Sequence, residues 1–525
     1  EFGIDVAIEG HKVAVIVRCP HFGGTLKSWD AQSIAGLDGI VTVFVIHSGV
    51  AIVAEGYWQA RRAATQLVVE WNKGPLAGVS SESMRRDQEQ ALATQSPDVV
   101  MEKGDIGSIN ADMSHQVIAN YHVPHAHHST MEPQNATALY TESPAGNRCE
   151  VWAPNQAPGV CRSLIVHYAG VSYDHAIINT TLMGCGFGRR GYADYVGEVV
   201  AIARQMAGTP IKLIWSREDD TQHDFYRPAS LHQLQGTLTD NGYIESWQHT
   251  LVAASFMRGL GVYMMAAILP EWVPIQAARP LGKTVGGILA KSDGGLAEGA
   301  EIPYRVDHLS VGVIEQDPGI PIGPWRSVSE SFNVFAVESF IDELAHKAGK
   351  DALVFRLQHL ADSPRHRQVL ETVAEKSNWG NAAKEISQGV AMSQPFGSFC
   401  AMVVEVSLHD SDYIIERIVA VVDCGTVISP DIVKAQIEGG IVYGLTAATK
   451  APVTFEEGKA VQSNFHDLPV LRIHEVPRME VHIIVSKQAP TGVGEVGVPA
   501  VAPALANALF AASGQRLREL PLKLI

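Results

Sequence analysis

The sequence predicts an α+β protein of several domains, built from mixed sheets and packed helices. Its 525 residues, 46% of them hydrophobic, are too many for one core and supply enough apolar side chains for two or three. After one strand–helix–strand unit, the chain turns to a hairpin instead of continuing into further strand–helix pairs. We therefore expect α+β domains over residues 1–105, 106–330 and 331–525.

Charge and cysteine spacing limit the partners. The formal net charge of −16, without a basic run, argues against nucleic acid or an anionic membrane. The longest apolar stretch, Gly259–Leu269, is too short to span a bilayer and Pro270 interrupts its continuation, so membrane association is expected only through partners. Because no C-x-x-C pair supplies a zinc or iron–sulfur site, any redox chain must continue on another subunit. The cysteines are Cys19, Cys149, Cys161, Cys185, Cys400 and Cys424.

The N-terminal 105 residues begin with short β-rich runs separated by Gly and Pro turns. A helical run over 56–67 precedes a strand over 68–71. The polar stretch 72–105 contains Gly, Pro and Ser, which predicts a surface connection without chemistry. The chain enters strand-like sequence at once, so we expect that an upstream segment precedes it.

A glycine-rich loop, residues 184–191, lies between a β-branched run, 176–183, and an amphipathic run, 192–207. The pattern predicts a strand, a loop and a helix start. Glycines let backbone N–H groups approach an anion, and a helix N-terminus adds partial positive charge, so a phosphate is the first ligand to consider. A tight connection without a ligand fits a single glycine motif equally well.

Gly186, Gly188 and Gly191 also satisfy the G-x-G-x-x-G pattern of dinucleotide-binding folds. Such a fold should continue into more strand–helix pairs. This chain instead predicts a hairpin, with strands over 235–239 and 243–250. An NAD dehydrogenase is therefore the weakest interpretation.

A histidine cluster comprises His122, His125, His127 and His128. Their density invites a metal hypothesis, but Pro124 prevents a helix from aligning them on one face. No matching ligand set is visible elsewhere in the sequence. We expect hydrogen-bonded or solvated histidines.

Arg326 follows Pro324 and Trp325 and comes just before a predicted helix over 333–348. An arginine at such a junction can bind an anion through two hydrogen bonds. A surface arginine beside a helix start is the simpler alternative. Further helices are predicted over 351–361 and 366–376.

Two long strands are predicted over 401–408 and 413–422, followed by a helix that begins at Pro430 with Ser429 as its N-cap. Gln436 would face inward on this helix. A glutamine on an apolar face usually hydrogen-bonds a buried partner, and that partner could be a ligand.

Glu495 is the only charged residue between Lys487 and Arg516, and it lies among glycines before an apolar helix that Gly514 closes. Such an isolated carboxylate is expected to be desolvated and to have an unusual pKa. It could act as a general base. Hydrogen bonding to the first-turn N–H groups of the helix is an equally compatible role.

Taken together, these motifs resemble the molybdopterin subunit of molybdenum hydroxylases. The resemblance is greatest to the isoquinoline 1-oxidoreductase beta-subunit type, which includes bacterial membrane-associated aldehyde dehydrogenases. It extends through nearly the whole chain. The motifs, in chain order, are Thr130-Met131-Glu132-Pro133, Gly186-Phe187-Gly188, Trp325-Arg326-Ser327, Gln436-Ile437-Glu438-Gly439, Asn464-Phe465-His466-Asp467, Gly492-Val493-Gly494-Glu495 and Val501-Ala502-Pro503.

The resemblance implies two molybdopterin-binding domains, 106–330 and 331–525, and a molybdenum–molybdopterin cofactor in its cytosine dinucleotide form. The pterin dithiolene would hold the metal, so no side chain is expected to bind it. The implied residue roles are as follows: Gly186, Phe187 and Gly188 lie beside the metal, Arg326 and Gln436 contact the cofactor, Glu495 is the general base, and Phe396 and Phe399 line the substrate pocket. The cofactor explains the glycine loop without a Rossmann fold.

The implied reaction oxidises an aldehyde to its acid, or hydroxylates an N-heteroaromatic ring, with water as the oxygen source. A [2Fe-2S] subunit and a cytochrome c subunit are the implied partners, at the periplasmic face of the inner membrane. Gly191 stands where xanthine-type enzymes have an acid, which argues against purines, and Cys185 interrupts the first glycine triplet. The upstream glycine–glutamine–glycine loop of this branch is missing, so a non-catalytic assembly subunit is the alternative of another class.

Overall fold

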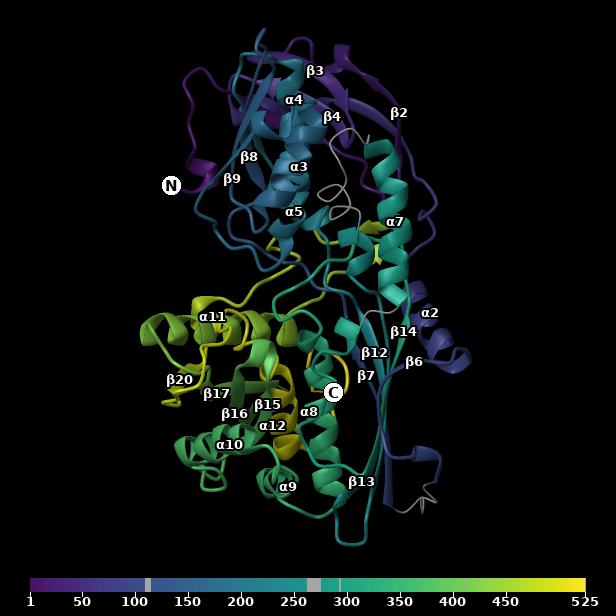
Figure 1. Ribbon diagram of the computed structural model, residues 1–525, viewed down its shortest axis with the longest axis vertical. Helices are drawn as coiled ribbons and strands as arrows, with labels where there is room; N and C mark the ends of the chain where they lie inside the picture. The colour runs from purple at the N-terminus through teal and green to yellow at the C-terminus, as the bar shows by residue number, and fades with distance from the viewer. Residues whose placement is uncertain (109–114, 262–274, 292–293, 411, 525) are drawn as a thin grey trace.

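The computed structural model describes residues 1–108, 115–261, 275–291, 294–410 and 412–524. The described residues form sheets of seven, five and four strands and two small two-stranded sheets. Figure 1 shows an upper lobe built mainly from N-terminal strands and a lower lobe that contains the C-terminal helices. This arrangement confirms the predicted α+β class with mixed sheets.

The seven-stranded sheet of the upper lobe has the order β10-β9-β8-β11-β1-β4-β3. Strands from the predicted 1–105 unit thus share a sheet with strands from 106–330. The glycine loop follows β10, but β9 and β8 separate β10 from β11, so the unit lacks the adjacent parallel strands of a dinucleotide-binding fold. The strands are β1 (Lys12–Val17), β3 (Ile40–Ile46), β4 (Gly49–Ala54), β8 (Asn135–Thr141), β9 (Arg148–Ala153), β10 (Ala176–Thr180) and β11 (Ile211–Ile214).

Helices cover both faces of this sheet because alternate side chains of its central strands point to opposite sides. In β1, Ala14 and Ile16 join the core beneath α3 (Pro158–Ala169) and α4 (Asp194–Gln205). Val15 joins the core beneath α1 (Tyr57–Gln66) on the other face. The predicted helix over 56–67 and the strand that follows it are confirmed.

The five-stranded sheet has the order β6-β14-β13-β12-β7 and includes the predicted hairpin. The polar stretch 72–105 is not a plain connection: it contains α2 and β6. A capping box between Ser80 and Ser83 begins α2, whose mostly polar surface hid it from the pattern. The elements are α2 (Ser81–Thr94), β6 (Asp98–Lys103), β7 (Gln116–Val123), β12 (Ser230–Leu238), β13 (Ile244–Ala253) and β14 (His308–Glu315).

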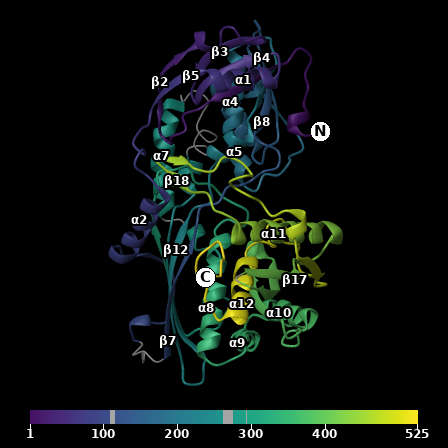
Figure 2. The ribbon, with the colours of Figure 1, turned by 180° about the vertical axis from the view of Figure 1, so that it is seen from behind.

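Helix α8 (Glu330–Lys347) lies between the five-stranded sheet and the four-stranded sheet of the lower lobe, and α2 lies on the other side of the five-stranded sheet (Figures 1 and 2). Residues Ser331 to Ala345 of α8 are all buried, which fits a helix covered on opposite sides. The four-stranded sheet has the order β15-β16-β17-β20. Its strands are β15 (Ser387–Ser393), β16 (Phe399–His409), β17 (Asp412–Asp423) and β20 (Arg478–Ile483).

Helices α11 (Pro430–Thr449) and α12 (Val501–Ser513) carry the C-terminal motifs. Gly514 closes α12 with φ +74°, as predicted. Pro430 begins α11 and Ser429 is its N-cap residue, as predicted, but the Ser429 side chain makes no capping hydrogen bond. The other elements are α5 (Arg217–Gln222), α7 (Ile275–Lys291), α9 (Ala352–Gln358), α10 (Pro364–Ser377), β2 (Thr25–Asp30), β5 (Val68–Asn72), β18 (Phe455–Glu456) and β19 (Lys459–Ala460).

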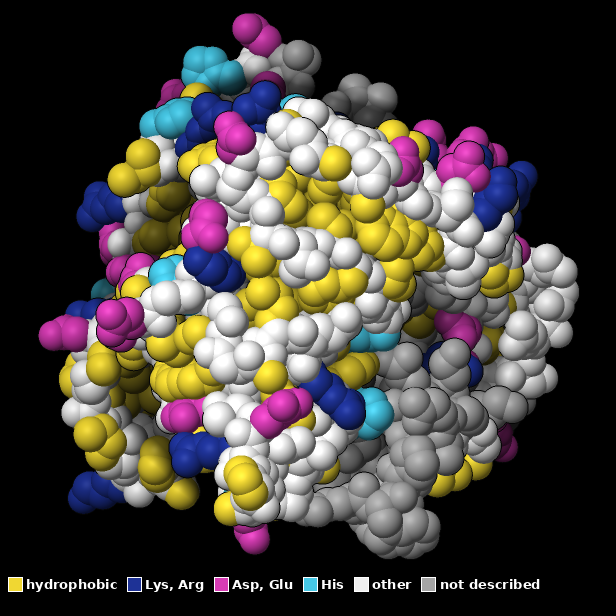
Figure 3. Space-filling model, turned by 90° about the horizontal axis from the view of Figure 1, so that it is seen from above, with side chains coloured by type: hydrophobic (Ala, Val, Ile, Leu, Met, Phe, Trp, Pro, Cys, Tyr) yellow, Lys and Arg dark blue, Asp and Glu magenta, His cyan; other side chains and the backbone are white. Residues whose placement is uncertain are grey.

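The length of the helices and the charges on the surface can be compared with the expectations about membranes and charged partners. Within the described ranges, no helix combines the length and the apolarity needed to cross a bilayer. Most of the apolar stretch Gly259–Leu269 lies outside the described residues. Viewed from above, the coloured surface shows acidic and basic side chains interspersed around a hydrophobic area (Figure 3).

Candidate active site

The glycine loop leaves β10 and closely approaches the segment before α8. Gly188 has φ +105°, and a Cβ there would lie 1.8 Å from the carbonyl oxygen of Pro324. Only glycine fits this position. Cys185 and Phe187 also have positive φ, +76° and +55°. The surrounding structure must therefore hold the loop in a costly conformation, as is common at functional sites.

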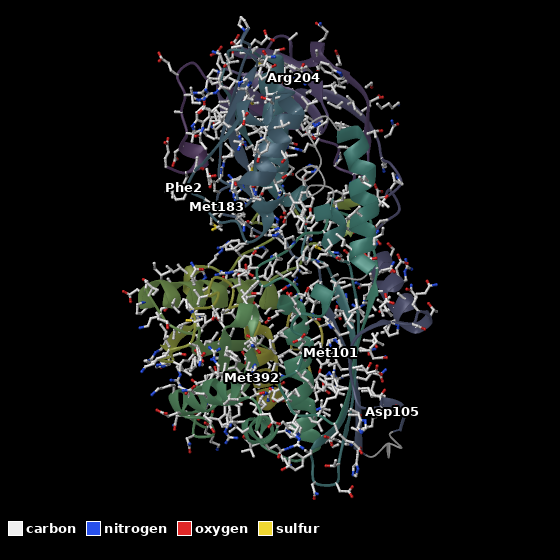
Figure 4. All side chains as sticks on the ribbon, in the orientation of Figure 1. Phe2, Met101, Asp105, Met183, Arg204 and Met392 are labelled. Atoms are coloured by element: carbon white, nitrogen blue, oxygen red, sulfur yellow. The ribbon has the colours of Figure 1, made fainter. Side chains whose placement is uncertain are left out.

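The loop amides have protein partners. Gly184 N donates to Glu132 Oε2 at 2.7 Å, and Gly188 N donates to Gln156 Oε1 at 3.1 Å. These two amides therefore do not point at a phosphate, which corrects the first expectation for the loop. Phe2 and Met183 are labelled in Figure 4 beside the start of the loop, where Phe2 pairs with Leu182 in a β-bridge.

Buried charges fix the other end of the loop. Arg189 Nη1 lies 2.8 Å from Asp194 Oδ1, and its Nε lies 3.0 Å from Asp224 Oδ1. Asp224 Oδ2 is 2.6 Å from His127 Nδ1 and accepts a hydrogen bond from His128 N at 2.9 Å. Of these five residues, only Asp194 is not fully buried. The carboxylate of Asp224 therefore ties the histidine cluster to the glycine loop.

Two residues of the histidine cluster, His127 and His128, bind the Asp224 carboxylate that anchors the glycine loop. Burial alone would lower the pKa of His127, but Asp224 and Asp220 raise it to about 9, so His127 is a cation paired with a carboxylate. Burial lowers the pKa of His125 to about 3. Among the described residues, no group of three or more His, Cys, Asp and Glu side chains is placed to hold a metal ion. His127 and His128 are hydrogen-bonded, as expected.

Arg326 connects segments that are distant in the sequence. Its Nε donates to the carbonyl oxygen of Gly494 at 2.9 Å, and its Nη2 donates to Gln436 Oε1 at 3.2 Å. Its Cζ lies 5.5 Å from the centroid of the Phe187 ring. Arg326 thus brings together the Phe187 ring, Gln436 and the loop that carries Glu495. Gln436 faces inward from α11, as its position on the helix predicted.

Glu495 accepts a hydrogen bond from Ser327 N at 2.7 Å through Oε2. Ser327 Oγ donates a second hydrogen bond, also at 2.7 Å, to the backbone carbonyl oxygen of Glu495. Burial raises the pKa of Glu495, while the Ser327 N–H group and the Arg326 charge oppose that rise. The N-cap of α12 is Ala500, so Glu495 is not the capping acid of that helix. Its carboxylate is instead oriented by the segment before α8.

An aromatic cavity of about 430 Å³ lies next to this junction. The Tyr443 ring centroid is 4.3 Å from that of Phe187 and 4.5 Å from that of Trp325. The Tyr443 hydroxyl donates to the carbonyl oxygen of His128 at 2.8 Å. Cys185 also lines the cavity. The volume falls in the range of small-molecule sites.

The guanidinium groups of Arg227 and Arg326 are buried near this cavity, and within the described ranges neither forms a salt bridge with a carboxylate. Arg227 lines the cavity, is 2% exposed and has an Nε atom without a hydrogen-bond partner. Burial lowers the pKa of Arg227 to about 10 and also lowers that of Arg326. Buried cations are normally paired, so this arrangement favours an anionic ligand.

The two phenylalanines predicted for the substrate pocket lie apart from the aromatic cavity. Phe396 is 54% exposed and lines a second cavity together with Ser327. Phe399 begins β16 and packs in the core, where its ring centroid lies 4.6 Å from that of His366. Phe399 therefore acts as a packing residue in this structure.

The sequence did not single out Gln156, Asp224 and Arg227, which complete the site. They are held by contacts between separate segments, and no local spacing marks them. Ser327 offered a weak signal, since it directly follows Arg326. Tyr443 lies two turns beyond Gln436 on α11, but the sequence does not show that its ring meets Phe187.

Family models and curated proteins show what the chain is similar to. Molybdopterin cofactor-binding domain models match residues 90–269 and 336–477. Isoquinoline 1-oxidoreductase subunit beta of Brevundimonas diminuta is 28% identical, over 99% of this chain and 66% of its own length. A membrane-bound aldehyde dehydrogenase of Gluconacetobacter polyoxogenes is also 28% identical, over 99% of this chain and 69% of its own length. The chain thus spans about two thirds of these relatives.

Solved structures share the fold. Quinoline 2-oxidoreductase from Pseudomonas putida 86 aligns with a TM-score of 0.77 at 14% identity, covering 99% of this chain and 94% of that one. The aldehyde oxidoreductase from Desulfovibrio gigas aligns with a TM-score of 0.74 at 13% identity, covering 99% and 77%. With the two cofactor-binding domain matches and the convergence of the motifs around Arg326, the chain belongs to the molybdenum hydroxylase family, as a molybdopterin-binding subunit.

Proposed function

We propose that this chain is the catalytic, molybdopterin-binding subunit of an oxidoreductase that takes its oxygen from water. It oxidises an aldehyde to the acid or hydroxylates an N-heteroaromatic ring. The convergence of Arg326, Gln436 and Glu495 beside Phe187 carries this proposal. The relatives named as aldehyde dehydrogenase and isoquinoline oxidoreductase support both substrate classes.

The residues fit an anionic cofactor such as molybdopterin. Arg227 and Arg326 are buried cations without a carboxylate partner among the described residues, and Gly188 leaves no room for a side chain beside Pro324. Arg326 and Gln436 would contact the cofactor, with Phe187 and Gly188 beside its metal. When bound, the cofactor supplies molybdenum and two-electron redox chemistry. We assign the cytosine dinucleotide form by similarity to this branch.

Glu495 would act as the general base. Burial raises the pKa of its carboxyl group, which makes the ionised carboxylate a better proton acceptor. The hydrogen bond from Ser327 N leaves Oε1 of the same carboxylate for the proton of the water that supplies oxygen. Arg326 holds the loop that carries Glu495 through the Gly494 carbonyl. The base is therefore positioned by the same residue that would contact the cofactor.

Electrons would leave through a [2Fe-2S] partner subunit and a cytochrome c subunit. All six cysteines are free and scattered, four of them buried. Buried, separated thiols do not form a cluster site. The curated relatives include proteins named as subunits, in agreement with a multi-subunit enzyme. We place it at the periplasmic face of the inner membrane by similarity to the same branch.

The test is cofactor occupancy. We expect about one molybdenum per chain in the purified complex, and Arg326→Ala and Gln436→Ala should each lower it because each removes a predicted cofactor contact. Arg86→Ala, at a side chain that is 67% exposed, is the control and should leave occupancy unchanged. Metal analysis of the purified variants measures this. Full occupancy in both site variants would contradict the assignment, and absence of molybdenum from the wild type would favour an assembly subunit.

A further inference from the structure

A second cavity, of about 480 Å³, adjoins the segment that holds Glu495. We call it the acidic cavity. Ser327 lines it, and the amide of Ser327 donates to Glu495 Oε2 at 2.7 Å. The volume is far above the roughly 15 Å³ that one water molecule needs. Water in this cavity would therefore lie beside the proposed base.

Two polar groups in the wall of the acidic cavity have no hydrogen-bond partner within the described ranges. One is Glu330 Oε2, at the start of α8 just beyond Ser327, and the other is Ser393 Oγ, on a side chain that is only 6% exposed. Buried polar groups are normally hydrogen-bonded, to ordered water where no protein group reaches them. We therefore expect bound water at both groups.

Carboxyl groups connect this buried part of the cavity with its rim. Glu298 and Glu301 line the cavity and are exposed to solvent, while Glu330 is only partly exposed. No lysine or arginine is among the described lining residues. The wall therefore offers proton-accepting groups both inside the cavity and at its mouth.

Glu330 has the acidity of a group that exchanges protons near neutral pH. Burial raises the pKa of Glu330 to about 8, and the charges of Glu298, Glu301 and Glu495 add to the rise. Glu495 is thus close enough to Glu330 for its charge to be felt there. A group transfers protons most effectively when its pKa lies near the working pH. Glu330 meets this condition.

Two other titratable groups that line the cavity do not. Burial, together with the charge of Arg365, lowers the pKa of His366 to about 4, so its imidazole stays neutral at pH 7. Glu338 is paired with Arg356, whose Nε lies 3.0 Å from Glu338 Oε2. Glu330 is therefore the group in this wall that is both unpaired and suited to carry a proton.

The proposed reaction requires a proton to leave. When water supplies oxygen to an aldehyde or to a ring carbon, each turnover yields the oxygenated product, two electrons and two protons. The electrons leave through the redox partners of the proposed function. One of the protons is first held by Glu495, which is only partly exposed and must lose it before the next turnover.

We propose that Glu330 relays the proton of Glu495 to solvent through water in the acidic cavity, with Glu298 and Glu301 at the outer end. This inference rests on the proposed function, because it requires Glu495 to be the base. A water molecule takes the proton from Glu495 as it gives one of its own to Glu330. Glu330 then releases a proton to water at the rim, and both carboxyl groups return to the ionised form. No electron moves in these steps.

The test uses the complete enzyme complex at matched molybdenum content, mixed with benzaldehyde or isoquinoline at pH 9 without an electron acceptor. Absorbance reports reduction of the enzyme, and a pH-indicator dye reports proton release in the same single turnover. In wild type we expect release to keep pace with reduction. Glu330→Gln should change the reduction rate less than about twofold but slow proton release at least roughly tenfold. Glu82→Gln, at a side chain that is 81% exposed, is the matched control and should change neither rate.

Two further measurements separate a relay from a structural role. Glu330→Asp keeps a carboxyl group and should restore most of the release rate. Imidazole, a proton carrier small enough for the cavity, should also shorten the delay in Glu330→Gln. A purely structural effect would slow reduction and release together, and neither addition would separate them again.

Release that keeps pace with reduction in Glu330→Gln, or equal slowing of both rates, would overturn the inference. If Glu330→Gln fails to fold, the wild-type pH series decides. Glu330 already holds a proton below pH 8, so release should fall behind reduction as pH drops, and release that keeps pace from pH 6 to pH 9 also overturns the relay. The proposed function is tested by the reduction rate alone: normal reduction of Glu495→Gln would remove the proposed base, whatever the Glu330 variants show.

Discussion

Gly188 shows how one absent side chain determines a site. Its positive φ and its approach to the Pro324 carbonyl allow the glycine loop to press Phe187 against Arg326 and Tyr443. The nearby Cys185 adopts a similar left-handed conformation although it has a side chain. The loop therefore depends on the surrounding packing for its shape.

Gly188→Ala should be severely destabilising, and we expect a loss of at least about 3 kcal/mol in the free energy of unfolding, from backbone strain and steric overlap together. Molybdenum content should fall with it. Gly191→Ala is the control in the same loop, because a Cβ there would meet no atom within 4 Å. Denaturant unfolding of both variants makes the comparison, and similar stabilities would contradict the close packing described for Gly188.

Glu495 gives the site a defined pH response. Because burial raises its pKa, the base is protonated and inactive at low pH, so kcat/KM should fall as pH drops through that raised pKa. The same shift makes folding less favourable as pH rises from the unfolded value through the folded one, since the native state holds the proton more tightly. A pH profile of kcat/KM measures the first effect. An acidic limb that persists in Glu495→Gln would belong to another group.

At the scale of elements, Asp224 is the point where the segment after α5, the histidine cluster and the glycine loop meet. It pairs with Arg189 and His127, both buried. Burial alone would raise the pKa of Asp224, but the two histidines hold it well below its usual range. The glycine loop is therefore anchored by charges as well as by packing.

Asp224→Asn should cost about 3–5 kcal/mol, because it leaves buried cations without their carboxylate. Asp240→Asn, at the tip of the β12–β13 hairpin with a side chain that is 94% exposed, should change stability by less than about 1 kcal/mol. Thermal unfolding of the two variants tests this. Equal unfolding midpoints would mean that the Asp224 cluster does not support the loop.

The sequence predicted those elements whose patterns are local. Helix α12 was readable from its apolar run and closing Gly514, and the β12–β13 hairpin from its turn residues. Helix α2 was missed because its polar surface gives little periodicity. The site was partly readable, since Phe187, Arg326, Gln436 and Glu495 lie in recognisable motifs. The partners Gln156 and Asp224 were not, because only the fold brings them to the loop.

At the scale of the whole molecule, the site lies where the two lobes meet. The glycine loop comes from the upper lobe, while α8 and α11, next to Arg326 and Gln436, belong to the lower lobe (Figure 1). Sheet sharing between the first 54 residues and residues 135–214 makes the upper lobe one packing unit. Local sequence patterns do not specify such pairings between distant strands, so composition and resemblance alone do not predict that strands from residues 1–105 and 106–330 share one sheet.

The most direct test of the account compares Glu495→Gln with wild type at matched molybdenum content. Glutamine has nearly the size of glutamate, and its amide oxygen can still accept the hydrogen bond from Ser327 N. It cannot act as the base. The measurement is the rate at which substrate reduces the enzyme in a single turnover. The account predicts a rate lower by on the order of 10²–10⁴, the usual contribution of a general base. A rate near that of wild type would show that Glu495 is structural and would contradict the account.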